Sequence, residues 1–148
     1  MAKALIIYGS TTGNTEFAAE EIETILKDNN VEITLKNVTD AGVEALENDF
    51  DLYLLGASTW GDDEIELQED FVDFFDDMKA APSFEGKRFA VFGCGDSTYD
   101  YFCGAVDAIE ERIKSKGGQL VAEGLKIDGD PETEEIREWT ESVVSTIA

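Results

Sequence analysis

The chain alternates short, mostly apolar runs with longer segments in which apolar residues recur every three or four positions. Three of the short runs are apolar almost throughout, as central strands covered on both faces are: residues 3–8, 52–56 and 88–93. Residues 31–36 alternate between apolar and polar side chains, which predicts a strand nearer the edge of a sheet. A fifth strand is expected at residues 119–121, at residues 125–127, or at both with a bend at Gly124.

Helices are expected between these strands. Helical spacing predicts them over residues 14–27 and 67–78, over a segment that ends at residues 116–118, and over a C-terminal segment, with a short helix around residues 43–47. Asp130-Pro131-Glu132 predicts the start of the last helix with proline in its first turn, and its buried stripe would contain Ile136, Trp139, Val143 and Ile147. Strands that alternate with helices predict a three-layer α/β fold with a parallel sheet.

Length and composition narrow the class of protein. A chain of 148 residues predicts one domain over residues 1–148, and no linker is evident. Hydrophobic residues make up 43% of the chain, which supports a real core. No apolar run approaches the roughly 20 residues of a membrane span, and no signal-peptide pattern opens the chain, so a cytoplasmic location is expected.

The balance of charged residues is strongly acidic. The 34 acidic and 11 basic residues give a net charge of −23, which would repel nucleic acid and anionic membranes. Partners are therefore expected to be basic or positively patched proteins that dock electrostatically, and the protein itself is expected to be a monomer.

The chain has no histidine, which excludes a Ser-His-Asp triad and a histidine metal site. Cys94 and Cys103 are too few for a four-cysteine iron–sulfur cluster, so no metal is expected and both should be buried, reduced thiols.

Three loops follow predicted strands, at residues 9–15, 57–64 and 94–103. The carboxyl ends of parallel strands share one edge of a sheet, so the loops would form a single ligand-binding rim. The first loop combines hydroxylated residues and two glycines with the start of a helix, which is typical of an anion cradle. Asn14 stands where a nucleotide-triphosphate loop needs lysine, which favours one phosphate monoester held by hydrogen bonds. The alternative is an ordinary Ser/Thr-rich helix cap without a ligand.

The other two loops each carry a large aromatic residue, Trp60 and Tyr99. Large aromatic side chains on loops are poorly buried unless something covers them, and two of them across a crevice suit a flat, conjugated ring. For each residue alone, a side chain folded back onto the core remains an alternative. Together with a phosphate loop on the same rim, they predict a phosphorylated planar cofactor.

The three loops also resemble those of a known family. Residues 9–15, 58–62 and 93–103 are similar to the three FMN-binding loops of flavodoxins, most closely the short-chain type of sulfate-reducing bacteria, and the resemblance covers the whole chain. It implies a doubly wound, five-stranded parallel sheet with the flavodoxin strand order 2-1-3-4-5. It also implies a low-potential one-electron carrier that uses non-covalently bound FMN to shuttle electrons between redox proteins, and not an enzyme.

The resemblance assigns roles to individual residues. The FMN phosphate would be bound by Ser10, Thr11, Thr12, Asn14 and Thr15, in a loop that includes Gly13, with Ser58 assisting. The ring would lie between Trp60 and Tyr99, and the Gly61 peptide would turn over to accept a hydrogen bond from ring N5. The rest of the implied cofactor-binding set is Thr59, Asp62, Cys94, Gly95, Asp96, Tyr101, Phe102 and Cys103.

Two other classes of protein share parts of this pattern. A small flavin-dependent reductase would need a substrate pocket, for which a single domain of this length leaves little room. A phosphoacceptor receiver domain needs an aspartate at the end of the third strand, where this chain has Ala57 and Ser58. The sequence therefore favours the electron carrier over both.

Overall fold

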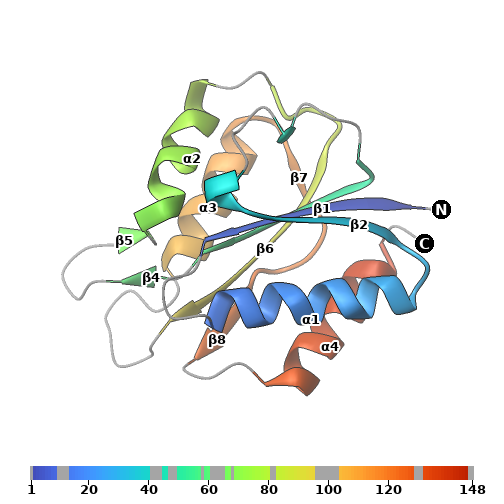
Figure 1. The fold of residues 1–148 in the computed structure, drawn as a ribbon. Helices are drawn as coiled ribbons and strands as arrows, with labels where there is room; N and C mark the ends of the chain where they lie inside the picture. The colour runs from blue at the N-terminus through green and yellow to red at the C-terminus, as the bar shows by residue number, and fades with distance from the viewer. Residues whose placement is uncertain are drawn as a thin grey trace.

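The computed structural model describes residues 2–9, 14–40, 45–46, 50–57, 59–60, 66–67, 69–80, 83–95, 104–128 and 132–146. A central sheet lies between two layers of helices (Figure 1). One face of the sheet is covered by α1 (Asn14–Asp28) and α4 (Thr133–Val144), and the other by α2 (Glu69–Ala80) and α3 (Gly104–Ser115). This arrangement confirms the three-layer α/β fold predicted from the sequence.

The main sheet is parallel, and its strands follow the order β2-β1-β3-β6-β7, with β8 also paired to β6. The strands are β1 (Lys3–Gly9), β2 (Glu32–Asn37), β3 (Leu52–Ala57), β6 (Arg88–Gly95), β7 (Gln119–Leu120) and β8 (Leu125–Asp128). This confirms the expected order 2-1-3-4-5, with β7 and β8 sharing the fifth place. A separate antiparallel pair, β4 (Thr59–Trp60) with β5 (Glu66–Leu67), is not predicted by the sequence pattern.

The fifth strand is split because the backbone bends close to α3. The first part of β6 pairs with β7 through Arg88 and Phe89, and β8 takes over from Phe92 onward. At the bend, a Cβ on Gly124 would lie 2.4 Å from Cγ1 of Val106, so only glycine fits there. Both expected segments are therefore strands, and the bend lies where the sequence placed it.

The two faces of the sheet build two separate hydrophobic cores, because successive side chains of a strand point to opposite faces. In β1, Ala4, Ile6 and Tyr8 join the core under α1 and α4, whereas Leu5 and Ile7 join the core under α2 and α3. All five are buried, which explains why the first strand is apolar almost throughout.

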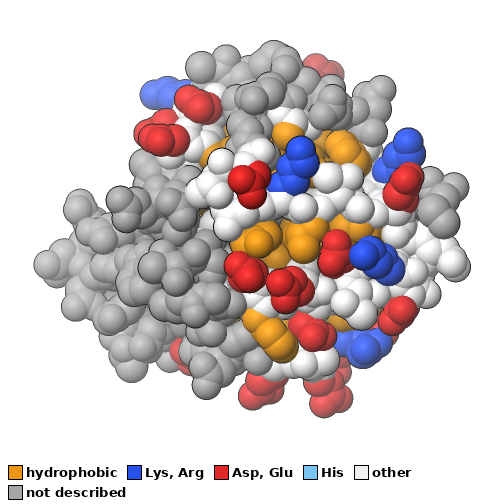
Figure 2. All heavy atoms as spheres, in the orientation of Figure 1, with side chains coloured by type: hydrophobic (Ala, Val, Ile, Leu, Met, Phe, Trp, Pro, Cys, Tyr) orange, Lys and Arg blue, Asp and Glu red, His pale blue; other side chains and the backbone are white. Residues whose placement is uncertain are grey.

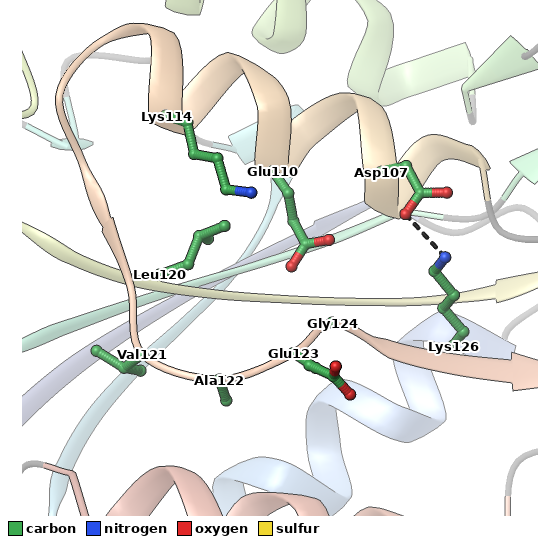
Figure 3. A pocket seen from close by; sticks show the side chains of 9 residues that line it. All are labelled: Asp107, Glu110, Lys114, Leu120, Val121, Ala122, Glu123, Gly124 and Lys126. Carbon is green, nitrogen blue, oxygen red and sulfur yellow. Dashed lines mark ion pairs between the residues drawn. The ribbon is translucent and has the colours of Figure 1, made fainter.

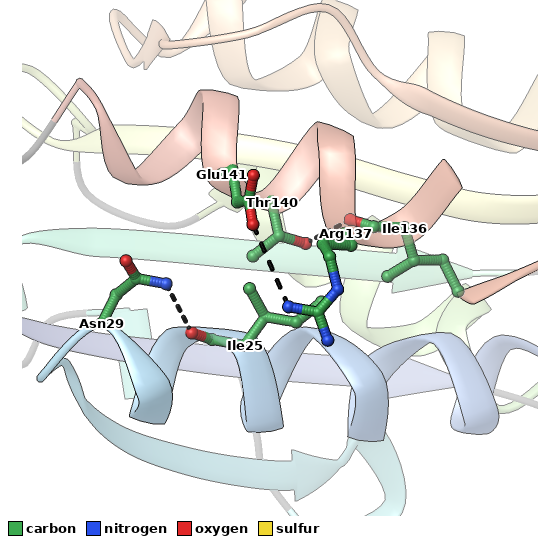
Figure 4. A network of polar contacts seen from close by, with 6 residues as sticks. All are labelled: Ile25, Asn29, Ile136, Arg137, Thr140 and Glu141. Carbon is green, nitrogen blue, oxygen red and sulfur yellow. Dashed lines mark hydrogen bonds and ion pairs between the residues drawn. The ribbon is translucent and has the colours of Figure 1, made fainter. Parts of the chain in front are cut away.

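Helices α1 and α4 pack side by side on one face (Figure 4). At the end of α1, the Asn29 side chain donates a hydrogen bond from Nδ2 to the Ile25 carbonyl at 2.8 Å. Asn30 follows with φ of 64°, a left-handed conformation that asparagine tolerates, and the chain turns into β2 as the sequence predicts. On α4, the buried Thr140 hydroxyl donates to the Ile136 carbonyl at 2.7 Å, so this hydroxyl is satisfied within its own helix.

The start of α4 differs from the sequence prediction. Glu132 is the N-cap and the helix begins at Thr133, so the prediction of a proline in its first turn was wrong. Extended backbone at Glu132, with φ of −109° and ψ of 129°, places the first helical residue at Thr133, two residues after Pro131. Ile136 and Val143 of the predicted stripe are buried and Trp139 is half-buried, while Ile147 lies outside the described residues. Most of the short helix expected around residues 43–47 also lies outside them, although a 3₁₀ turn, η1 (Val38–Asp40), precedes that segment.

Arg112 joins the two helices on the other face of the sheet. Its guanidinium donates to the Phe75 carbonyl at 2.6 Å and lies 4.0 Å from the centre of the Phe75 ring. Arg112→Ala should lower the free energy of unfolding by about 2 kcal/mol, the sum of a charged hydrogen bond and a cation–π contact. Urea unfolding measures this change. Arg137→Ala is the control, because its exposed pair with Glu141 spans 4.0 Å and should contribute less than about 0.5 kcal/mol; equal losses would contradict the assignment.

Candidate functional site

Three central strands end at one edge of the sheet (Figure 1). In the register of the sheet, Gly9 at the end of β1 lies beside Ala57 at the end of β3, and β6 continues to Gly95. The chain leaves β1 towards β2 on one side and later enters β3 on the other, so the strand order reverses between β1 and β3. Ligands of open α/β sheets bind outside the strand ends at this reversal.

Two helices begin at the same edge. Helix α1 starts at Asn14, five residues after β1 ends, and α3 starts at Gly104 after β6. The first N–H groups of a helix have no partner within the helix, and the helix dipole favours negative charge near them. The edge therefore offers backbone donors for an anionic group, as the cradle predicted at residues 9–15 requires.

One contact ties the first predicted loop to the third. Thr15, in the first turn of α1, is fully buried, and its hydroxyl makes a hydrogen bond with the thiol of Cys94 near the end of β6. Burial raises the pKa of Cys94, the Thr15 hydrogen bond lowers it and the carboxylate of Glu135 raises it, and together they bring it to about 11. Cys94 is thus a buried, protonated thiol, as the sequence predicts, and not a nucleophile.

The raised pKa of Cys94 predicts a loss of stability at alkaline pH. The unfolded chain releases this proton near its ordinary value of 9.0, before the folded protein does near 11. The stabilising contribution is therefore fully present below pH 9 and falls by about 2 kcal/mol as the pH rises to 11. Urea unfolding between pH 8 and 11 measures it, and Cys94→Ala should show a correspondingly shallower decline. Parallel declines in both proteins would contradict the assignment, because tyrosines and lysines titrate in both.

Gly93, one residue before Cys94, is a site residue that the sequence analysis did not single out. A Cβ on Gly93 would lie 2.2 Å from the Ala57 carbonyl oxygen and 3.0 Å from Cγ2 of Val106. Only glycine therefore lets β6 approach both the end of β3 and the start of α3. The run Gly93-Cys94-Gly95 hints at such a close approach, but the neighbouring atoms that require it come from distant parts of the chain.

The second predicted loop contributes the strand β4, which lies beside β6 and α3. Thr59 pairs with Leu67 and Trp60 with Glu66, so a local antiparallel pair fixes the backbone of both predicted residues at the rim. The described part of the second loop therefore lies beside the strand that leads into the third loop.

Tyr8 is a further polar group at this end of β1 that the sequence analysis did not assign to the rim. Its hydroxyl makes hydrogen bonds with the side chains of Asn37 and Glu16, and its pKa is raised by burial and then by the carboxylates of Glu16 and Glu20. Because Tyr8 belongs to the core under α1 and α4, this network connects β1, β2 and α1 beneath the rim. In the sequence, this network is indicated by a tyrosine that stands one residue before the first predicted loop.

Many of the predicted cofactor-binding residues lie outside the described residues. These are Ser10, Thr11, Thr12, Gly13, Ser58, Gly61, Asp62, Asp96, Tyr99, Tyr101, Phe102 and Cys103. For Asn14, Thr59, Trp60 and Gly95 the structure describes the backbone. The individual roles of all these residues stay predictions.

A cavity of about 640 Å³ lies away from this rim, between α3 and the segment that links β7 to β8 (Figure 3). None of the predicted site residues lines it. Three of its charged groups have partners: Lys126 pairs with Asp107 at 2.8 Å, and Glu110 accepts a hydrogen bond from the Gly124 backbone. Burial, then Asp107, raises the pKa of Glu110, while Lys114 and Lys126 lower it. The cavity is a mixed-charge surface hollow, and the candidate site remains the rim.

The described residues contain neither a membrane-spanning helix nor a metal-binding cluster. None of their helices combines the length and apolar character of a membrane-spanning segment. Their His, Cys, Asp and Glu side chains form no group of three that could hold a metal ion.

Comparison with known proteins identifies relatives that span the chain. The family model described as Flavodoxin matches residues 6–140. A flavodoxin of Maridesulfovibrio salexigens is 51% identical over 147 residues, which cover 99% of this chain and 100% of that one. A flavodoxin of Nitratidesulfovibrio vulgaris is 47% identical, with 99% and 100% covered. The crystal structure of oxidised flavodoxin 2 from Bacillus cereus superposes with a TM-score of 0.89 at 38% identity, covering 98% of this chain and 99% of that one.

Proposed function

Because this chain belongs to the flavodoxin family, we propose that it carries low-potential electrons, one at a time, on FMN bound without a covalent link. Flavodoxins are electron-transfer proteins, so the chain is a flavin-based electron carrier and not an enzyme, and its cofactor is FMN. Family membership thus decides against the reductase and the receiver domain.

The rim fits the phosphate of FMN. It offers two helix N-termini and the hydroxyl of Thr15, and these are neutral hydrogen-bond donors that suit a single terminal phosphate. The observation that carries the assignment is the hydrogen bond between Thr15 and Cys94, because it joins the first and third predicted loops at the reversal of strand order. The phosphate-binding set of the proposal is Ser10, Thr11, Thr12, Gly13, Asn14, Thr15 and Ser58.

Bound FMN supplies the electron-accepting ring, and the residues around it set the energy of each charge state. In the proposal, Trp60 and Tyr99 cover the two faces of the ring and exclude water, which disfavours a charged ring. The Gly61 carbonyl would accept a hydrogen bond from a proton on ring N5, since glycine would permit the required turn of the peptide. Carboxylates near the ring, which in the proposal include that of Asp62, would disfavour negative charge on the ring and lower the potential of the second electron.

The proposal includes the setting in which the protein works. The chain acts as a single FMN-binding domain over residues 1–148, in the cytoplasm and as a monomer when dilute. The net charge of −23 supports redox partners with basic or positively patched surfaces, which electrostatic attraction would steer towards the protein.

The function is tested on the purified chain. It should show the visible absorption bands of a flavin, release FMN and not FAD on denaturation, and take up two electrons at separate midpoint potentials in an anaerobic titration. A chain that stays colourless after incubation with FMN would overturn the proposal. Fast direct reduction by NAD(P)H would support the reductase instead.

Electrostatic docking predicts that the rate of electron transfer to a partner protein depends strongly on salt concentration. With a small haem protein that has an excess of surface lysines, the second-order rate of electron transfer should fall at least about tenfold between ~0.02 M and ~0.5 M salt, as charges beyond the Debye length are screened. Stopped-flow absorbance measures the rate, and a small neutral oxidant is the control. A rate that is insensitive to salt with the lysine-rich partner would contradict electrostatic docking.

A further inference from the structure

Strand β2 forms one edge of the main sheet, and no strand in the described part of the chain pairs with its outer side. It runs across the front of the molecule in Figure 1. In the same view, Figure 2 shows apolar side chains in a band across the middle of this face, along β2 and above α1. In the part of the chain that the structure describes, this edge is thus left unpaired and can accept a strand of another molecule.

The backbone of β2 presents a regular set of outward groups. The Glu32 amide donates to the Ala2 carbonyl at 2.8 Å, and β1 pairs with β2 in register from there. In a parallel strand, the N–H and C=O of one residue point to the same side, and the side alternates along the strand. Glu32, Thr34 and Lys36 therefore bond to β1, whereas Ile33 and Leu35 point their N–H and C=O groups outward. Within the described residues, those four outward groups have no hydrogen-bond partner.

The side chains of β2 combine an apolar face with one acidic and one basic residue. Ile33 and Leu35 pack against the core under α1 and α4 but are only half-buried. Glu32 and Lys36 are exposed, four residues apart, and neither has an ion-pair partner in the part of the chain that the structure describes. The strand thus has one negative end, one positive end and an apolar face between them.

We propose that this edge pairs with β2 of a second copy of the chain, antiparallel and about a two-fold axis at Thr34. In that register Glu32 faces Lys36 of the second copy, and Lys36 faces its Glu32, so both charges are paired. Ile33 lies opposite Leu35 of the second copy, and these residues exchange the N–H···O=C bonds that the outward groups offer. The two sheets become one continuous sheet, and the interface is isologous.

The pairing of Glu32 with Lys36 favours this register, and it favours an identical strand as the partner. Shifting the axis to Leu35 places Lys36 opposite Thr34 and Glu32 opposite Val38, and shifting it to Ile33 places Glu32 opposite Thr34. Only the axis at Thr34 pairs both charges, so an identical strand is a partner that matches this edge. A parallel copy in register would place like charges beside each other.

The pairing leaves the candidate site free. The carboxyl ends of the strands of two antiparallel copies point in opposite directions, so the two rims lie at opposite ends of the joined sheet. The contact is confined to one strand edge, and two chains of charge −23 repel each other, so the dimer is a high-concentration state. The inference does not depend on the bound cofactor.

Charge reversal tests the register. In sedimentation velocity of the FMN-loaded protein at about 0.15 M salt, from ~10 μM to ~1 mM, the wild type should dimerise reversibly. Glu32→Lys and Lys36→Glu should each dimerise about tenfold more weakly, because each variant places like charges opposite each other. An equimolar mixture of the two variants should recover dimerisation, because every Glu then faces a Lys. The double variant Glu32→Lys/Lys36→Glu should recover it alone.

Matched variants control for net charge. Glu138→Lys on α4 and Lys114→Glu on α3 change the charge by the same amounts at exposed positions away from β2, and mixing them should add nothing to their self-association. Circular dichroism and the flavin spectrum establish that every variant is folded. The proposal is overturned if the wild type stays monomeric throughout, if the mixture of edge variants sediments as the average of its parts, or if the control mixture behaves like the edge mixture.

Discussion

Replacing Gly93 by alanine is expected to lower the free energy of unfolding by about 3 kcal/mol, at the upper end of overpacking in a buried sheet. The new Cβ would lie 2.2 Å from the Ala57 carbonyl oxygen, and a backbone atom cannot move aside as the end of a side chain can. The ends of β3 and β6 must separate, and both strands lead into predicted FMN-binding loops. Affinity for FMN should therefore fall together with stability.

Urea unfolding of the apoprotein and fluorescence titration with FMN measure the two effects. Gly86→Ala is the control for losing a glycine without a clash, because no atom lies within 4 Å of its new Cβ, although φ of 84° makes alanine strained there. It should cost about 1 kcal/mol and leave FMN affinity unchanged. If Gly93→Ala were no more destabilising than Gly86→Ala, the close approach at β3 and β6 would not be a constraint.

Thr15→Val is expected to weaken FMN binding by about tenfold to a hundredfold, the loss of one hydrogen bond to a charged group. Valine keeps the shape of the side chain and removes only the hydroxyl, which is buried between the start of α1 and Cys94. The reason for the loss is that, in the proposed site, this hydroxyl helps to hold the FMN phosphate. Titration of the apoprotein with FMN, and with riboflavin, which lacks the phosphate, measures it.

The second fully buried threonine provides a matched control. Thr140 donates its hydroxyl to a carbonyl of its own helix, on α4 and away from the predicted loops. Thr140→Val should alter stability by about 1 kcal/mol and leave FMN affinity unchanged. Riboflavin affinity should be almost unaffected by either variant. Equal FMN affinity in Thr15→Val and the wild type would remove Thr15 from the phosphate site.

Local patterns in the sequence were enough to predict the architecture. The apolar runs became β1, β3 and β6, and the alternating residues 31–36 became the edge strand β2, because burial on two faces or one leaves a distinct pattern. The order of the strands came from family resemblance. The same local logic predicted the turn at Asn30 and the bend at Gly124, where few residues besides glycine and asparagine are tolerated.

What the sequence did not reveal depends on contacts between distant segments. The need for glycine at position 93 arises from Ala57 and Val106, which lie far away along the chain. The β4–β5 pair consists of two residues on each side, too few to show an alternating pattern. Proline at position 131 suggested an earlier helix start, but extended backbone at Glu132 postponed it. The hydrogen bond between Thr15 and Cys94 likewise appears only when the first loop and the fourth strand of the sheet are brought together.

The central position of β1 in the sheet has a consequence for the chain while it is being translated. Strand β1 is translated before both of its neighbours in the sheet, β2 and β3, and its side chains on one face share a core with α4, which follows much later in the chain. The apolar, nearly uncharged strand β1 therefore stays without its full set of partners until more than a hundred further residues have been translated. During that time it could associate with other unfinished chains. A large excess of carboxylates in the rest of the chain, through mutual repulsion of unfinished chains, protects that strand during the wait.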